Sequence, residues 1–218
     1  MNHLDSQSTK KSTTSTIAVV DYGHGNLGSI KNMLKKIGAS CVIASQSSQL
    51  ESAEKIILPG VGAFDSGMRA LKEKGLLEGL LKKATKDNTY LLGVCLGMQM
   101  LGESSEEGEL QGLGLIQGHC RKFPVKADSR LKVPRMGWSE VTPKPNALLF
   151  NEIDSPPRFY FVHSYYFECD NLSHVAATSK YGITYTAAIQ SGNIFGVQFH
   201  PEKSHKFGMR LLRNFVEL

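Results

Sequence analysis

The sequence has no apolar run long enough to cross a membrane, and its first fifteen residues lack the apolar segment of a secretory signal. Its 25 lysines and arginines exceed its 20 acidic residues by only five charges, and the basic residues are scattered rather than gathered in a block. The composition therefore gives no support for a membrane protein, a secreted protein or a nucleic-acid-binding protein.

Cysteine is scarce as well. The four cysteines, at positions 41, 95, 120 and 169, are far apart and form no C-x-x-C pair. A structural zinc site or a disulfide framework is therefore not expected, and we predict no metal and a reducing, cytoplasmic location. Because the cysteines share no framework, the role of each must be judged from its own neighbours in the sequence.

What is present fits a globular protein. The chain has 218 residues, of which 41% are hydrophobic and 21% charged, so it can bury a substantial core. Residues 1–15 are rich in serine and threonine, and we predict that they form a flexible tail. Residues 16–218 show no strong internal boundary and are predicted to form one domain.

The first half alternates strand and helix patterns. Short apolar runs predict strands at 16–20, 41–44, 55–58 and 90–94, the third of them halted by Pro59-Gly60. Apolar residues at helical spacing predict helices over 26–37 and 71–84. Nearly continuous apolar strands that alternate with helices are typical of a parallel sheet covered on both faces.

The second half has a different pattern. Short strand-like runs, separated by proline and glycine turn signals, occur at 131–133, 158–168, 174–178, 183–189 and 194–199. A closing helix is predicted over about 203–216. The fold class is therefore α/β: a mostly parallel central sheet flanked by helices, with antiparallel strands added in the second half.

The sharpest local pattern is G-V-C-L-G at residues 93–97, between a buried strand and a helical stretch. It is the cysteine version of the nucleophile elbow, in which flanking glycines permit a tight turn at the end of a strand. The following helix N-terminus favours a negative charge, and the thiolate is the reactive form of cysteine. Cys95 is thus a candidate nucleophile rather than a buried structural cysteine.

A cysteine nucleophile needs a base that a third group orients. The segment F-H-P-E at residues 199–202 supplies both, at the end of the predicted strand 194–199. His200 and Glu202 are two residues apart, so in extended structure their side chains lean to the same side. Taken alone this segment would be a surface turn, but beside the elbow it is the best available partner.

A third element is the loop P-G-V-G at residues 59–62, directly after a predicted strand. Such a loop can aim backbone N–H groups at a developing oxyanion, and in elbow enzymes the residue after the nucleophile supplies a second donor. Val61, Gly62 and Leu96 are the candidates for this oxyanion hole. By itself the loop would be interpreted as a plain β-turn.

Together these motifs resemble the class I, triad-type glutamine amidotransferases, in their order and over nearly the whole chain after Thr16. The resemblance implies a flavodoxin-like architecture, no cofactor, and attack by Cys95 on the side-chain amide of L-glutamine to form a thioester. It implies that His200 protonates the departing ammonia and then activates water while Glu202 orients it. It also implies that the substrate is held by Gly60, Gln99, Glu107, Ser164 and Tyr165.

Within that family the chain is most similar to the glutaminase subunits of imidazole glycerol phosphate synthases. The residues that carry this similarity include D-Y-G-H-G-N-L (21–27), S-S-E-E-G (104–108), M-G-W (136–138) and H-P-E-K-S (200–204). The resemblance implies a heterodimer with a (β/α)8-barrel cyclase, which receives the ammonia and forms imidazole glycerol phosphate and AICAR in histidine biosynthesis. The implied interface comprises Asn26, Met136, Trp138, Tyr160 and Lys203.

Three other functions stay open at this point. A paralogous subunit of the same kind could deliver ammonia to a partner that aminates a surface sugar in lipopolysaccharide or O-antigen pathways. The same elbow could also belong to a cysteine peptidase-like hydrolase, or to an interaction protein that has kept an inactive amidotransferase fold. The intact Cys95, His200 and Glu202 argue against the last of these.

Overall fold

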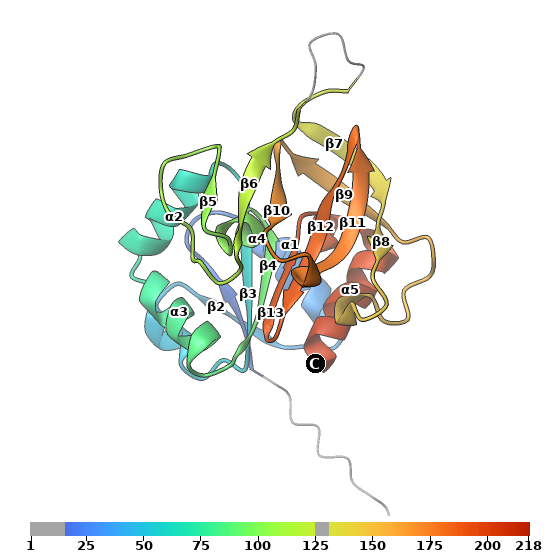
Figure 1. Ribbon diagram of the computed structural model, residues 1–218. Coiled ribbons are helices and arrows are strands. Elements are labelled where there is room, and N and C mark those ends of the chain that lie inside the picture. The colour runs from blue at the N-terminus through green and yellow to red at the C-terminus, as the bar shows by residue number, and fades with distance from the viewer. Residues whose placement is uncertain (1–15, 125–130) are drawn as a thin grey trace, which may run out of the picture.

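The computed structural model describes residues 16–124 and 131–218 (Figure 1); the predicted tail lies outside them. Within this part of the chain, no helix has both the length and the apolar character that crossing a bilayer requires. The first half contains β1 (Ile17–Val20), α1 (Leu27–Lys36), β2 (Cys41–Ala44), η1 (Ser47–Leu50), β3 (Lys55–Gly60), α2 (Phe64–Glu73), α3 (Leu77–Thr85), β4 (Tyr90–Cys95) and α4 (Leu96–Met100).

The second half is mostly β-structure, and it confirms the predicted change of pattern. Its elements are β5 (Ser104–Ser105), β6 (Gly118–Lys122), β7 (Arg135–Glu140), β8 (Thr142–Pro143), η2 (Leu148–Phe150), β9 (Arg158–His163), β10 (Tyr165–Cys169), η3 (Leu172–His174), β11 (Val175–Tyr181), β12 (Ile183–Ser191), β13 (Ile194–Val197), η4 (Pro201–Lys203) and α5 (His205–Glu217).

The central sheet has the strand order β2-β1-β3-β4-β13-β12-β10-β6-β5, with β11 and β8 joined to it through β12. Strands β1 to β4 and β13 pair in parallel, as the apolar runs predicted. From β13 onward the pairing to β12 and β10 is antiparallel. The sheet is therefore mostly parallel on one side of β13 and mostly antiparallel on the other.

Helices cover both faces of the parallel part, because alternate residues of each strand point to opposite sides. On one face Ile17 and Val19 of β1 belong to a core that includes α1 and α5, which lie behind the sheet in Figure 1. On the other face Ala18 and Val20 pack into a second core with α2, α3 and α4. Sheet and helices form three layers, and the carboxyl ends of the strands meet at one edge.

Two predicted boundaries in the first half were wrong. The single helix expected over 71–84 is two helices, α2 and α3, separated by a turn in which Gly75 has φ +65°. A glycine tolerates this left-handed conformation at no steric cost. Strand β3 does not halt at Pro59-Gly60 but continues through both, because Pro59 and Gly60 lie beside Val94 and Cys95 in the parallel ladder.

The second half also departs from the prediction at three places. Residues 131–133 form no strand; the strand of that region is β7, which pairs with β9 in a separate two-stranded sheet. The run 158–168 is divided at Ser164 into β9 and β10, which join different sheets. The strand expected over 194–199 ends at Val197.

Candidate active site

Cys95 occupies a tight turn between β4 and α4. Its backbone has φ 55° and ψ −106°, a conformation that a non-glycine residue adopts only when its surroundings enforce it. The surroundings are crowded: a Cβ on Gly93 would come within 2.6 Å of the Gly97 carbonyl oxygen, and a Cβ on Gly97 would collide with the Leu58 carbonyl. The glycines of the predicted elbow are therefore required by close backbone packing.

His200 and Glu202 meet as predicted, although the reason given for it was wrong. The chain is not extended there, because Pro201–Lys203 form the 3-10 turn η4. Within this turn His200 Nδ1 lies 2.8 Å from Glu202 Oε1, and both side chains are only 2% exposed. The Ser204 hydroxyl anchors the turn, since it donates to the His200 carbonyl at 2.6 Å and accepts from the Tyr160 N–H at 3.0 Å.

The contact with Glu202 determines which nitrogen of His200 faces the pocket. A carboxylate only accepts hydrogen bonds, so Nδ1 of His200 carries the proton that it donates to Glu202. Nε2 of the same ring points away from Glu202. Nε2 is buried and makes no hydrogen bond within the described residues. Burial lowers the pKa of His200, but interactions with Cys95 and Glu202 outweigh it and raise this pKa to about 10. The imidazole is thus arranged to hold a proton opposite the sulfur.

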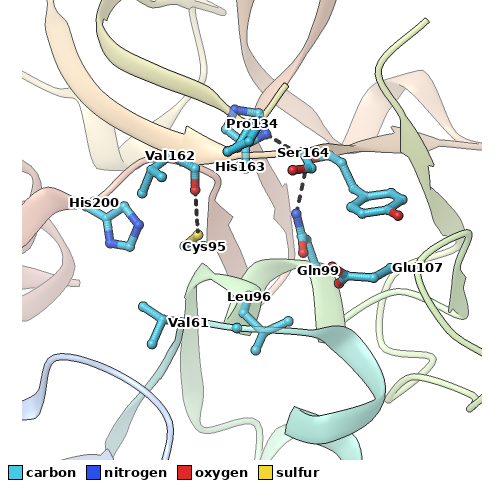
Figure 2. Close-up of a pocket in the computed structure, with 12 residues that line it drawn as sticks. Val61, Cys95, Leu96, Gln99, Glu107, Pro134, Val162, His163, Ser164 and His200 are labelled. Atoms are coloured by element: carbon cyan, nitrogen blue, oxygen red, sulfur yellow. Dashed lines mark hydrogen bonds between the residues drawn. The ribbon is translucent and has the colours of Figure 1, made fainter. Parts of the chain in front are cut away.

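The sulfur of Cys95 has two polar neighbours besides the imidazole. Its thiol lies 3.9 Å from the Val162 carbonyl oxygen, to which it donates (Figure 2). It also lies 3.7 Å from the side-chain Nε2 of Gln198. The sequence analysis did not single out Gln198, which is a fully buried polar residue in an otherwise apolar strand end.

A cavity of about 250 Å³ opens at the sulfur. It brings together the predicted triad members Cys95 and His200, the oxyanion candidates and all but one of the predicted substrate residues. Its lining comprises Val61, Gly62, Cys95, Leu96, Gln99, Glu107, Pro134, Val162, His163, Ser164, Tyr165 and His200. Gly60 does not line it but lies beneath, against Leu96 and Gly97.

Gln99 and Glu107 lie at the far end of the cavity from His200 (Figure 2). Gln99 Nε2 donates to the Tyr165 carbonyl at 3.1 Å and to Gln198 Oε1 at 3.0 Å, so both of its amide hydrogens are used within the protein. Glu107 accepts from the Phe64 N–H at 2.9 Å. These two side chains therefore offer oxygen acceptors to whatever enters the cavity, as a substrate amine requires.

The oxyanion candidates surround the sulfur on the side of β3 and α4. Leu96 begins α4, so its N–H belongs to the first helical turn and has no acceptor within the helix. Gly62 has φ +99°, which favours glycine, and Val61 precedes it in the loop. The Val61 carbonyl is 3.2 Å from His24 Nδ1, which fixes the orientation of this loop.

His163, which the sequence analysis did not single out, supports the cavity wall. Its Nδ1 donates to the Tyr165 carbonyl at 2.7 Å, the same oxygen that Gln99 binds. Burial lowers the pKa of His163 to about 3, helped by the positive charge of Arg135. His163 is therefore neutral, and its Nε2 can accept from Arg135 at 3.5 Å.

Except for Asn26, the predicted interface residues form one group at the surface, in which Tyr160 is half-buried. Trp138 and Tyr160 lie opposite each other on β7 and β9, with ring centroids 6.2 Å apart, and Lys203 Nζ is 5.7 Å from the Tyr160 ring. Met136 follows the same face of β7 and is 66% exposed. Asn26 is exposed at the start of α1, on a different element. Trp138, 39% exposed, is not a core aromatic.

Away from the cavity, three side chains place one potential ligand atom each within 4.8 Å of one another: Glu103, His119 and Asp170. His119 Nε2 lies 3.5 Å from Glu103 and 3.8 Å from Asp170. None of the three lines the cavity, and both carboxylates are exposed. They form a surface ion-pair group that is separate from the chemistry at Cys95.

Comparison with known proteins agrees with this geometry. The family model "Glutamine amidotransferase class-I" matches residues 18–218. The chain belongs to the class I glutamine amidotransferases. Within this family it is 50% identical to imidazole glycerol phosphate synthase subunit HisH 2 of Methanococcus maripaludis, over 92% of this chain and 98% of the relative. It is 48% identical to subunit HisH 2 of Pseudomonas aeruginosa, over 93% and 99%.

Two solved structures share the fold at low sequence identity. PurLQS from Thermotoga maritima aligns with a TM-score of 0.72 and 20% identity, covering 94% of this chain and 98% of that one. A crystal structure described as a glutamine amidotransferase aligns with the same TM-score and 19% identity, over 92% and 97%. These likenesses establish the class I amidotransferase fold, with its mostly parallel sheet flanked by helices.

Proposed function

We propose that this chain is the glutamine-hydrolysing subunit of an imidazole glycerol phosphate synthase and acts in histidine biosynthesis. Relatives that match it along nearly their full length carry that subunit's name. The observation that carries the chemistry is the meeting of Cys95 and His200 at one cavity, with Glu202 Oε1 2.8 Å from His200 Nδ1. In this proposal Cys95 is the nucleophile, His200 the acid and base, and Glu202 the group that orients it.

In the first step the sulfur of Cys95, its proton held by His200 Nε2, attacks the side-chain amide carbon of glutamine. A C–S bond forms and the carbonyl electron pair moves to oxygen. The N–H of Leu96 and the backbone of Val61 and Gly62 would stabilise that oxyanion. When the C–N bond breaks, His200 gives its proton to the leaving nitrogen, so ammonia departs and a γ-glutamyl thioester remains.

In the second step a water molecule attacks the thioester. His200 takes the proton of the water as its oxygen bonds to carbon, and the C–S bond then breaks. Glutamate leaves, and the proton on His200 again faces the sulfur. Glu202 stabilises the imidazolium in both steps, because its carboxylate accepts from Nδ1.

Substrate recognition in this proposal uses the opposite end of the cavity. The Gln99 oxygen and the Glu107 carboxylate would accept from the α-ammonium group of glutamine, with the backbone at Ser164 and Tyr165 nearby. A cavity of about 250 Å³ suits one free amino acid better than an extended peptide. This argues for a glutaminase over a peptidase.

The partner in this proposal is a (β/α)8-barrel cyclase that receives the ammonia. Its support in this chain is the exposed group of Met136, Trp138, Tyr160 and Lys203 on the two-stranded sheet and the following turn. A large aromatic beside a methionine and a cation is the composition of a binding anchor. Channelling to a partner also predicts low glutamine hydrolysis by the isolated chain.

The experiment that tests the chemistry is the variant Cys95→Ala, assayed for glutamate release from glutamine with the cyclase subunit present. We expect turnover to fall by about 10⁴-fold or more, because Cys95 is the one cysteine among the described residues that line the cavity. Cys41→Ala, which changes a half-buried cysteine on β2, is the matched control and should keep full activity. Glutamine hydrolysis by Cys95→Ala at the wild-type rate would rule the assignment out.

A further inference from the structure

Gln198 lies directly after β13, two residues before His200, and its side chain is 0% exposed. Its backbone N–H donates to the Ala187 carbonyl at 2.9 Å, which continues the pairing with β12 and fixes the residue in place. A glutamine amide buried without partners would be costly, so its hydrogen bonds identify its role. Its neighbours are Gln99 on one side and the sulfur of Cys95 on the other.

The orientation of the Gln198 amide follows from its neighbours. The Tyr165 carbonyl can only accept, so Gln99 must present its NH₂ group there, at 3.1 Å. The second hydrogen of that NH₂ group goes to Gln198, at 3.0 Å, and requires an oxygen. The Oε1 atom of Gln198 is therefore turned toward Gln99. Its Nε2 is turned toward the Cys95 sulfur, at 3.7 Å.

We propose that Gln198 is a further catalytic residue, whose side-chain N–H donates to the Cys95 thiolate and holds the sulfur in its charged, reactive form. An N–H donor favours an anion over the neutral thiol. The Val162 carbonyl, at 3.9 Å, acts in the opposite sense, because it can only accept from the protonated thiol. The inference rests on the proposed function, since it assigns Gln198 to the same nucleophile.

Among the described residues, the titratable side chains around the sulfur do not act as its neutral hydrogen-bond donor. His200, backed by Glu202, faces the sulfur from the turn after β13, and neutral His163 lines the wall of the same cavity. Tyr22 faces the sulfur from the segment after β1, but its hydroxyl donates to the Pro59 carbonyl at 2.7 Å. Among the described residues, Gln198 therefore supplies the neutral side-chain donor to Cys95.

The test measures the rate at which iodoacetamide alkylates Cys95 as a function of pH, read by mass spectrometry of the Cys95 peptide. It uses the full chain and needs neither glutamine nor a partner. Gln198→Glu keeps the oxygen that Gln99 binds but replaces the donor by a negative charge. Gln198→Met removes the donor and adds no charge. The control is Gln117→Glu, which makes the same change at an exposed position.

We expect the midpoint of the alkylation profile to move upward by about one pH unit or more in Gln198→Glu, a tenfold loss of thiolate at a fixed lower pH. Gln198→Met should move it in the same direction by less, and Gln117→Glu should leave it unchanged. Should Gln198→Glu fail to fold, the midpoint of Gln198→Met decides alone. Wild-type midpoints in the Gln198 variants that fold would overturn the inference.

The outcome is separable from that of the proposed function. If the midpoint moves but the wild-type chain with its partner does not hydrolyse glutamine, the role of Gln198 stands and the glutaminase assignment fails. If glutamine is hydrolysed and the midpoint does not move, the assignment stands and the role of Gln198 is refuted. The two measurements therefore judge the two statements independently.

Discussion

Glu202 holds a carboxylate where almost no water reaches it, since its side chain is only 2% exposed. One oxygen binds His200, and the other has no hydrogen-bond partner among the residues described. Removing a carboxylate from water is unfavourable unless a nearby cation compensates for it. Glu202 is therefore placed to stabilise a protonated His200. The free energy that burial of its carboxylate costs is not expected of a purely structural side chain.

Replacing Glu202 by glutamine tests this role. We expect Glu202→Gln to reduce glutamine turnover by about 10² to 10⁴-fold, because the imidazole loses both its orientation and the charge that stabilises it. The pKa of His200 should fall from about 10, since Glu202 is one of the groups that raise it. Steady-state turnover with the partner present measures the first effect.

The stability of this variant should depend on pH in a defined direction. A histidine whose pKa is raised from 6.5 to about 10 on folding stabilises the fold fully below pH 6.5. That contribution is lost as the pH rises toward 10. Thermal unfolding of Glu202→Gln should therefore differ from wild type more at pH 6 than at pH 10. Glu152→Gln, which changes an exposed partner of Arg210, is the control; equal losses in both variants would contradict the prediction.

At the scale of elements, the N-terminus of α2 and the loop that follows β5 hold each other. Glu107 from the loop accepts from the Phe64 N–H, and Asp65 from the helix accepts from the N–H groups of Glu109 and Leu110, both at 3.0 Å. These backbone hydrogen bonds lower the pKa of Asp65. The carboxylate of Glu107, which faces the cavity, is thus positioned by the carboxylate of Asp65, which lies outside the cavity.

Asp65→Asn should loosen this loop, because an asparagine has one acceptor oxygen where the aspartate uses two. We expect the KM for glutamine to rise about two- to tenfold while kcat changes little, since Asp65 holds the loop that carries Glu107 and does not bind the sulfur. Steady-state kinetics with the partner present measure both constants. Asp87→Asn, which changes an exposed carboxylate that pairs with Lys83 of α3, should behave as wild type; a loss confined to kcat would contradict the prediction.

The sequence predicted the parallel half of the fold well because its strands are buried on both faces. A continuous apolar run such as 90–94 needs no knowledge of its neighbours to be assigned. The break between α2 and α3 was missed because a glycine within a helical pattern is often tolerated. Gly75 was therefore not recognised as the end of a helix. Strand β7 was missed because its apolar residues, Met136 and Trp138, are exposed and pair only with β9.

The candidate site was predictable where a residue type has a known chemistry and less so where the role depends on packing. Cys95, His200 and Glu202 could be proposed from the sequence because thiol, imidazole and carboxylate occur at recognisable spacings. Gln198 carried a weaker signal: a single amide in the apolar run 194–199, on the same side of the chain as His200. Only the three-dimensional contacts with Gln99 and Cys95 distinguish it from a surface residue.

At the scale of the whole molecule, the exposed group around Trp138 makes a prediction about assembly. Its indole stacks on the ring of His205 with centroids 5.5 Å apart, so the anchor is already ordered without a partner. Trp138→Ala should weaken binding to the proposed barrel cyclase by about 30-fold or more, as loss of an aromatic hot spot does. Isothermal titration calorimetry with the purified cyclase measures this change.

The free energy of unfolding of Trp138→Ala should stay close to that of wild type, because the side chain is partly exposed on the outer face of a two-stranded sheet. Leu172→Ala, at a hydrophobic residue that is 72% exposed on another element, is the control and should bind the cyclase normally. Equal binding by the Trp138 and Leu172 variants would remove the support for this surface.

The place of β13 in the sheet has a consequence for how the protein is made. It is the last strand along the chain, yet it lies between β4 and β12, at the centre of the molecule. A growing polypeptide that has left the ribosome as far as residue 190 already carries the cysteine strand but still lacks the histidine. Cys95 therefore gains its imidazole only after β13 and the turn that follows it have been made, and a chain that stops before them holds the thiol without its base.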